Sequence, residues 1–278
     1  MAEKIPGFII NSLKISDKIS SALTVQLGVF LFTKPIKHKP PKREHFYFEH
    51  ATQQLIDVPS INKKINVFRL GTGDKKILLT HGWSGRGTQL VKIAEAFYKL
   101  GYEVISFDGP AHGKSTGSNT LMIEFIASIH QINKVFGPFD YAVGHSLGAM
   151  ATLHAASTDF DVKKIVTIGS GDLIDDIIKD FVRRLKLKSK YVDLLRSYFE
   201  KKYPFKMSDF DASNSASKLT IPTLIIHDEN DKDVPVSCAH HIHKHHPNST
   251  LMITKGLGHN KIMGDEQVIN SIVNFFNS

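Results

Sequence analysis

The sequence has one cysteine, Cys238, and one tryptophan among 278 residues. A single cysteine excludes an intramolecular disulfide and is typical of a reducing compartment, so we expect a cytoplasmic protein. The uncharged stretch at residues 19–32 is shorter than the roughly 20 apolar residues that a membrane-spanning helix needs. It also has no convincing cleavage site of the signal-peptide kind, so the sequence predicts neither a spanning helix nor a secretory leader.

Acidic side chains are in the minority, because 35 Lys and Arg residues stand against 27 Asp and Glu residues and give a net charge of +8. Such a balance favours anionic surfaces or substrates without specifying them. The basic segments have neither the interleaved aromatic residues nor a recognition pattern of DNA- or RNA-binding proteins, so we expect no nucleic-acid partner. The length and an apolar content of 41% indicate one globular domain with an insertion.

The most informative motif is Gly144-His145-Ser146-Leu147-Gly148, which follows a short apolar run and precedes a stretch of small residues. A serine in a tight turn between a strand and a helix needs neighbours without Cβ atoms, so that its hydroxyl can project outward. The following helix offers a positive dipole end for negative charge that develops there. The pattern predicts that Ser146 is a nucleophile, with an ordinary Gly-Ser turn as the alternative.

Candidate partners for this serine lie downstream. A serine hydroxyl is a weak nucleophile at neutral pH and needs a base, usually a histidine oriented by a carboxylate. One predicted strand runs into Asp228, Asp231 and Asp233, and a later predicted strand is followed by a glycine-containing loop with His259. The chain therefore supplies both a carboxylate and a base after the serine.

A second glycine-containing loop, at residues 81–85, follows the predicted buried strand at residues 76–80. Acyl transfer needs hydrogen-bond donors aimed at the oxyanion, and a glycine-relieved loop after a strand can present a backbone N–H for that purpose. The N–H groups of Trp83 and Leu147 are the predicted pair of donors. An ordinary glycine turn is the alternative.

From about residue 46 to the C-terminus, these motifs resemble the α/β-hydrolase superfamily. The segment 81–85 is similar to the oxyanion loop after the third strand of that family, and the segment 144–148 is similar to its nucleophile elbow. The segment 108–115 resembles the Asp- and glycine-containing loop after its fourth strand. The order Ser, Asp, His along the chain is that of this superfamily and differs from the orders of chymotrypsin-like and subtilisin-like proteases.

The resemblance implies that His259 is the base and that Asp231, four residues before Pro235, is the acid. Two other aspartates crowd the same loop. Asp228 lies nearest the strand end and could cap the turn, and Asp233 could cap a helix that has Pro235 in its first turn. Resemblance and spacing favour Asp231.

Predicted strands alternate with predicted helices along the rest of the chain. This alternation indicates an α/β fold, a mostly parallel twisted sheet with helices on both faces, whose catalytic groups collect at the carboxyl ends of the strands. Segments 46–50 and 65–70 are interpreted as short strands of an antiparallel edge. The remaining strands are predicted at residues 76–80, 103–108, 140–143, 163–169, 222–227 and 250–254, and helices at 121–136 and 266–276.

A long connection of about 50 residues separates the strand that ends near Gly169 from the strand that starts at Pro222, which is more than a simple crossover needs. Apolar residues recur within it at helical spacing. We interpret residues 172 to about 211 as a small helical cap over the site, with simple packing on the core as the alternative. The basic middle of this segment is typical of a solvated face.

Residues 1–45 are separate from the predicted hydrolase domain at 46–278, because they combine an apolar helical stretch with a basic, proline-rich linker. Such a segment could dock on the body of the protein, lie at a membrane surface or mediate self-association. Docking on the body is the favoured interpretation, and the membrane-surface interpretation makes the protein a peripheral one. The sequence carries no signal for an oligomeric state.

A dense group of histidines follows Cys238. His241 and His245 are one turn apart on a predicted helix, with Cys238 one turn earlier, and such a set could hold a transition metal. Because the segment contains no carboxylate, a surface run of histidines is the favoured interpretation. We expect neither a metal nor another cofactor.

The sequence thus predicts a serine hydrolase that cleaves a small-molecule carboxylic ester through an acyl-enzyme. Ser146 attacks the acyl carbon, His259 transfers the proton, Asp231 orients the imidazole, and the amides of Trp83 and Leu147 bind the oxyanion. A lipase or thioesterase that acts at a membrane surface is one alternative. A non-catalytic binding protein on the same fold is another.

Overall fold

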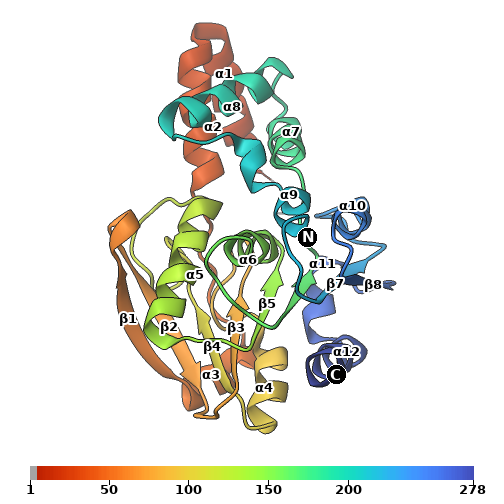
Figure 1. The fold of residues 1–278 in the computed structure, drawn as a ribbon. Coiled ribbons are helices and arrows are strands. Elements are labelled where there is room, and N and C mark those ends of the chain that lie inside the picture. Colours follow the sequence, from red (N-terminus) through yellow and green to blue (C-terminus); the bar gives the residue numbers. More distant parts are fainter. Residues whose placement is uncertain (1–4) are drawn as a thin grey trace.

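A sheet of eight strands forms the centre of the computed structural model, which describes residues 5–278 (Figure 1). The strands are β1 (Thr52–Val58), β2 (Lys63–Leu70), β3 (Lys76–Thr80), β4 (Glu103–Phe107), β5 (Tyr141–His145), β6 (Lys164–Ile168), β7 (Thr223–Asp228) and β8 (Ser249–Thr254). Their spatial order is β1-β2-β4-β3-β5-β6-β7-β8. Strand β2 is antiparallel to both neighbours, and every other neighbouring pair is parallel, as the sequence predicts.

Helices cover both faces of the sheet, because the side chains of its strands alternate between two hydrophobic cores. In β5, Ala142 points into one core, whereas Tyr141 and Val143 point into the other. The first core is closed by α5 (Met122–Phe136), α6 (Leu147–Ala156) and α10 (Ser237–His245). The second is closed by α3 (His45–His50), α4 (Val91–Lys99) and α12 (Glu266–Asn277). Shorter elements are α9 (Ala212–Ala216), α11 (Gly258–Lys261), and the 3-10 turns Lys42–Glu44, Pro59–Ile61, Met207–Phe210 and Ile262–Gly264.

The first predicted edge strand is wrong, because residues 46–50 belong to helix α3 and the edge strand β1 begins at Thr52. Three aromatic residues in a row favour a strand by propensity alone. Here Tyr47 is fully buried and packs edge-on against Phe68, and the ring of Phe46 stacks on His50 one helical turn later. Tertiary packing of the aromatic side chains therefore overrides the local propensity.

Two helical pairs form what we call the head of the molecule, which stands above the sheet in Figure 1. One pair is α1 (Gly7–Ile19) and α2 (Ser21–Thr33), and the other is α7 (Ile174–Arg184) and α8 (Lys190–Lys202). The second pair lies within the segment 172–211 that the sequence predicts as a helical cap. Because the cap follows β6, it rises from the edge of the sheet at which the parallel strands end.

The apolar stretch near the N-terminus docks on this cap. Phe32 of α2 packs edge-on against Phe181 of α7, with the ring centroids 5.0 Å apart. A Cβ atom added at Gly28 would lie 3.4 Å from the side chain of Leu195 of α8, an ordinary contact distance, so this face of α2 packs against α8. The sequence favoured docking on the body of the protein, and the structure shows that the partner within the chain is the cap. Residues 1–4 of the predicted N-terminal segment lie outside the described residues.

A linker at residues 34–44, here called the strap, connects the head to the hydrolase body. Its backbone N–H at Ile36 donates to the Ser84 hydroxyl at 3.0 Å, in the loop that follows β3. At its end, the fully buried carboxylate of Glu44 accepts two hydrogen bonds of 2.6 Å from the guanidinium of Arg86 and a third from Thr88. The strap is thus anchored to the connection after β3 at two points, Ser84 and Arg86. Within residues 5–278, every helix is too short or too polar to cross a membrane.

Candidate active site

Ser146 occupies a sharp turn between β5 and α6. Its backbone has φ 55° and ψ −122°, a conformation that L-residues rarely adopt. A Cβ atom at Gly148 would lie 2.4 Å from the carbonyl oxygens of Thr80 and His81, and one at Gly144 would lie 2.5 Å from the Cα atom of Ala149. Both glycines are therefore required for the strand, the turn and the helix to pack together.

His259 and Asp231 lie together at the same edge of the sheet. The Nδ1 atom of His259, which is in α11, lies 2.7 Å from Oδ2 of Asp231, in the loop after β7. The other carboxylate oxygen of Asp231 accepts the backbone N–H groups of Asp233 and Val234 at 2.8 and 2.9 Å. Burial raises the pKa of Asp231, but the His259 and amide hydrogen bonds outweigh it and hold the pKa below its ordinary value. The carboxylate is therefore charged and fixed in orientation.

The two other aspartates of the loop, Asp228 and Asp233, differ in their contacts from Asp231, which bonds to His259. Asp228 accepts hydrogen bonds from Thr254, from the amide of Leu257 and from the amide of Asn230, and so ties the ends of β7 and β8 together. This is the turn-capping role that the sequence allowed for it. The helix cap that the sequence allowed for Asp233 is not formed, because α10 begins at Ser237 with Val236 in the N-cap position. Asp231 is thus the carboxylate of this loop that bonds to His259.

Ser146 and His259 both lie against the end of β6, at Ile168 and Gly169. The N–H of Ser146 donates to the carbonyl of Ile168 at 2.9 Å, and a Cβ atom at Gly169 would lie 3.2 Å from Nδ1 of His259. His145 adds a further link, because its Nε2–H donates to the carbonyl of His259 at 2.9 Å. Among residues 5–278, the Ser146 hydroxyl makes no hydrogen bond with the imidazole. In unliganded enzymes such bonds are often long and tighten only when substrate is bound.

The loop at residues 81–85 lies directly against the serine. A Cβ atom added at Gly82 would lie 2.8 Å from Cβ of Ser146. Trp83 follows Gly82, and Leu147 follows Ser146, so both backbone amides are within one residue of this contact. Within the described part of the chain, neither amide has a protein acceptor. The Trp83 side chain is 37% exposed and packs edge-on against His112.

Two buried histidines hold this loop in place, and the sequence reasoning assigned them no role. Nδ1–H of His81 donates to the carbonyl of Gly82 at 2.7 Å, and its Nε2 accepts the N–H of Gly109 at 2.8 Å. Nε2 of His112 accepts the N–H of Ser84 at 3.0 Å. Burial lowers the pKa of His81 to about 4 and that of His112 to about 3, so both rings are neutral and able to accept at neutral pH. The sequence did carry one signal for this role, because His81 lies in the loop at 81–85 and His112 lies in the loop at 108–115.

Comparisons with known proteins agree with this geometry. The family model described as "alpha/beta hydrolase fold" matches residues 75–202, and one described as "TAP-like protein" matches residues 202–277. The chain belongs to the α/β-hydrolase superfamily.

Solved structures of other α/β hydrolases share the fold. An esterase from Pyrococcus furiosus is 18% identical and has a TM-score of 0.68, with 88% of this chain and 97% of that chain covered. An esterase from Exiguobacterium antarcticum is 17% identical with a TM-score of 0.65, and the match covers 82% of this chain and all of the other. A bromoperoxidase from Bacillus anthracis is 20% identical with a TM-score of 0.62, and the match covers 81% of this chain and 99% of that chain.

Among characterised sequences, an (E)-2-((N-methylformamido)methylene)succinate hydrolase from Acinetobacter baylyi is 32% identical over 118 residues. That match covers 40% of this chain and 43% of the other protein, so the chain aligns with less than half of its relative. The structural neighbours, at 17–20% identity, show the fold that this chain shares with them.

The histidine-rich stretch forms helix α10. His241 of α10 contacts the buried carboxylate of Asp172, which comes from the connection between β6 and α7. The fold thus supplies the carboxylate that the local sequence lacks. Even so, no cluster of three metal-binding side chains is present within residues 5–278. Burial raises the pKa of the Cys238 thiol to about 11.

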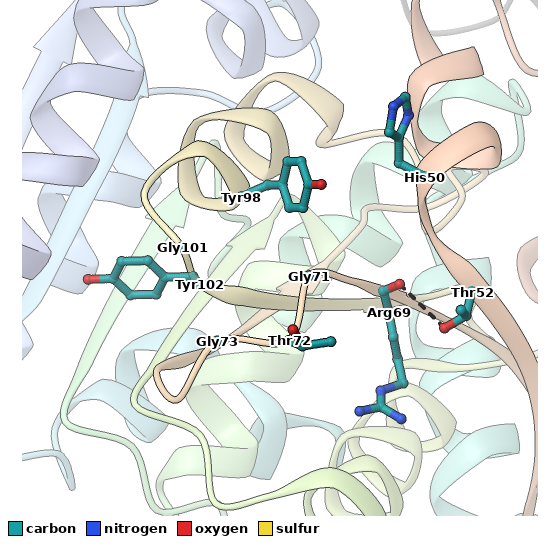
Figure 2. A pocket seen from close by; sticks show the side chains of 9 residues that line it. All are labelled: His50, Thr52, Arg69, Gly71, Thr72, Gly73, Tyr98, Gly101 and Tyr102. Atoms are coloured by element: carbon teal, nitrogen blue, oxygen red, sulfur yellow. Dashed lines mark hydrogen bonds between the residues drawn. The ribbon is translucent and has the colours of Figure 1, made fainter.

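A cleft of about 710 Å³ opens at the other end of the sheet, near the end of β2 (Figure 2). Figure 2 shows Tyr98 and Tyr102 beside the glycine-containing turn at residues 71–73, with Thr52 bonded to the carbonyl of Arg69. None of the site residues that the sequence predicts lines this cleft. The candidate active site of this α/β hydrolase is therefore at the opposite edge, around Ser146.

Proposed function

We propose that this α/β hydrolase cleaves a carboxylic ester through a covalent acyl-enzyme on Ser146. The observation that carries the proposal is the 2.7 Å bond between His259 and Asp231 beside the strained turn that holds Ser146. A serine in such a turn, next to an imidazole fixed by a carboxylate, is the arrangement that activates a hydroxyl.

In the first half of the reaction, Oγ of Ser146 attacks the acyl carbon while Nε2 of His259 takes the hydroxyl proton. The amides of Trp83 and Leu147 donate to the oxygen that becomes negative. When the tetrahedral intermediate collapses, the bond to the alcohol breaks and His259 gives it the proton. In the second half, His259 deprotonates a water molecule, which attacks the acyl carbon and releases the carboxylic acid and free Ser146.

Asp231 has the role of an orienting group. Its bond to Nδ1–H selects the tautomer whose Nε2 lone pair faces the serine, and its negative charge stabilises the imidazolium. The two amide bonds from Asp233 and Val234 prevent the carboxylate from rotating away. The hydrolase relative and the esterase structures are consistent with this chemistry. Because one fold serves many substrates, they do not identify the substrate of this chain.

The test compares the wild-type protein with Ser146→Ala and with Ser271→Ala, a matched serine on α12 far from the site. Hydrolysis of p-nitrophenyl butyrate should fall to background in Ser146→Ala and stay at the wild-type rate in Ser271→Ala. Circular dichroism and melting temperature confirm that all three proteins are folded. Full activity of Ser146→Ala would rule out the proposal, and inactivity of the wild type toward a panel of esters together with no fluorophosphonate labelling would favour the binding-protein alternative.

A further inference from the structure

The positive charge of the protein is concentrated in the head and the strap. Residues 5–44 and 174–202 contain 16 Lys and Arg against 7 Asp and Glu, a net charge of +9. The rest of the chain contains 19 Lys and Arg against 20 Asp and Glu, a net charge of −1. The head itself, residues 5–33 and 174–202, contains 11 Lys and Arg against 6 Asp and Glu, a net charge of +5, and Figure 1 shows it standing clear of the sheet.

The tip of this head is apolar and exposed. Ile15 is 60% exposed, Ile19 is 72% exposed and Leu23 is 40% exposed, and all three lie at or next to the turn between α1 and α2. Because Ile15 and Ile19 are four residues apart on α1, their side chains share one helix face. Large apolar side chains that gather on an exposed turn indicate a contact surface rather than scattered exposure.

Basic side chains flank this apolar tip, because the connection between α7 and α8 lies beside it. Lys188 forms an ion pair of 2.9 Å with Asp17 of α1, and Lys190 donates to the Ser21 hydroxyl of α2 at 3.0 Å. These contacts hold the turn between α1 and α2 against the connection between α7 and α8. Lys18 and Lys186, one from each turn, are exposed as well.

We propose that the tip of the head docks on an anionic membrane surface, with Ile15, Ile19 and Leu23 inserted among the lipids and the flanking lysines at the headgroups. An apolar tip with basic side chains beside it is the pattern of interfacial membrane attachment, in which apolar insertion and attraction to anionic lipid add together.

A second copy of the chain is a poorer occupant of this surface. Two heads, each with a net charge of +5 over residues 5–33 and 174–202, would repel each other when their tips met. An anionic bilayer instead attracts the positive charge and offers an apolar environment for the isoleucine side chains. The surface lies on α1, α2 and the α7–α8 connection, so membrane binding can be measured independently of the chemistry at Ser146.

The experiment is co-sedimentation of the full chain with vesicles of phosphatidylcholine alone and of phosphatidylcholine with 30% phosphatidylglycerol. We expect binding to the anionic vesicles that weakens strongly between 0.1 and 0.5 M salt, and little binding to the neutral ones. Lys18→Ala with Lys186→Ala, which leaves the Asp17 ion pairs intact, should lower the partition coefficient about fivefold for each lysine. Ile15→Ser with Ile19→Ser should lower it by about tenfold or more.

Matched controls come from the body of the protein. Leu55 and Leu100 are 54% and 50% exposed, and serine at both positions should leave binding unchanged. Alanine at the exposed Lys99 and Lys232 removes the same charge far from the tip and should also have little effect. Wild-type protein that ignores anionic vesicles, or head variants that bind as the wild type does, would overturn the proposal. A concentration-dependent dimer in light scattering that the isoleucine variant loses, without vesicle binding, would identify a second copy as the occupant.

Discussion

The Nε2 atom of His112 accepts the backbone N–H of Ser84 at 3.0 Å, so the loop after β4 holds the loop after β3 in position. Ser84 has φ 55°, a conformation that needs such support in a residue other than glycine. Because Trp83 is its neighbour, the bond also sets the direction of the amide proposed to bind the oxyanion. His112 is therefore expected to act on the reaction through this loop as a positioning residue.

Replacing His112 by Phe keeps the ring volume and removes the acceptor. We expect kcat for a p-nitrophenyl ester to fall about tenfold to a hundredfold with a small change in KM, since a misdirected oxyanion donor loses part of its effect. Ser84→Ala is the matched control, because it removes the hydroxyl that the strap contacts and leaves the N–H in place. A kcat of His112→Phe equal to that of the wild type would show that the bond has no part in catalysis.

Gly169 lies beside the His259 imidazole and has φ 57°. In Gly169→Ala the new Cβ atom would lie 3.2 Å from Nδ1 of the imidazole, so we expect activity to fall as well as stability. Gly256→Ala is the control, because Gly256 has φ 83° and no heavy atom within 4 Å of the added Cβ. Both variants should lose about 1–2 kcal/mol of unfolding free energy from the left-handed backbone. Equal activities of the two variants would contradict the placement of the imidazole.

The strap depends on the buried ion pair of Glu44 and Arg86. Glu44→Gln leaves the guanidinium of Arg86, which is only 13% exposed, without its counter-charge. Breaking one side of a buried pair typically costs about 3–5 kcal/mol, and we expect urea denaturation to show a loss of that order. Asp57→Asn, which removes an exposed pair with Lys64, should change the midpoint very little. A small effect of Glu44→Gln would mean that the strap is not fastened at this point.

Three buried histidines predict how stability depends on pH. Burial lowers the pKa of His81 to about 4, and the pKa values of His112 and His145 to about 3, from an ordinary value of 6.5. At pH values between 6.5 and these lowered pKa values, each of the three histidines binds more protons in the unfolded chain than in the folded one. Their contribution to the free energy of unfolding is therefore complete above pH 6.5 and is lost as the pH falls toward 4. Each histidine contributes a slope of up to about 1.4 kcal/mol per pH unit.

The carboxylates titrate in a different window. The pKa values of Asp228 and Asp231 lie below their ordinary value, because hydrogen bonds to each carboxylate outweigh the effect of burial, so their stabilisation is lost only at more acidic pH. Urea denaturation at pH 7, 6 and 5 separates the three histidines from these two aspartates, because, of these residues, only the histidines should change the free energy of unfolding in this range. A free energy of unfolding that is constant over this range would contradict neutral, buried imidazoles.

Much of the fold could be predicted from the sequence because its central strands are continuous apolar runs. The strands β3 and β5 are buried along almost their whole length and end in glycine-containing loops, so both the strand and the turn have local signals. Helix α3 could not be predicted in this way, because the packing of Tyr47 on Phe68, which lies on a distant strand, decides its conformation.

The site was predictable to the extent that its residues lie in local motifs. Ser146 and His259 each follow a recognisable strand, whereas the choice of Asp231 over Asp228 depended on spacing and resemblance. In the structure, the difference is the direction of each carboxylate, which the backbone amides after β7 determine. The bond between His112 and Ser84 and the docking of α2 on α8 join segments far apart in the chain, and no local pattern encodes either contact.

The most direct test of the account locates the activated hydroxyl chemically. The full chain is treated with a fluorophosphonate, the adduct is mapped by peptide mass spectrometry, and the labelling rate is compared between the wild type, Asp231→Asn and Asp233→Asn. The account predicts a single adduct on Ser146, a labelling rate that falls by up to about 10⁴ in Asp231→Asn, and a rate close to the wild type in Asp233→Asn. An adduct on another residue, or undiminished labelling of Ser146 in Asp231→Asn, would contradict it.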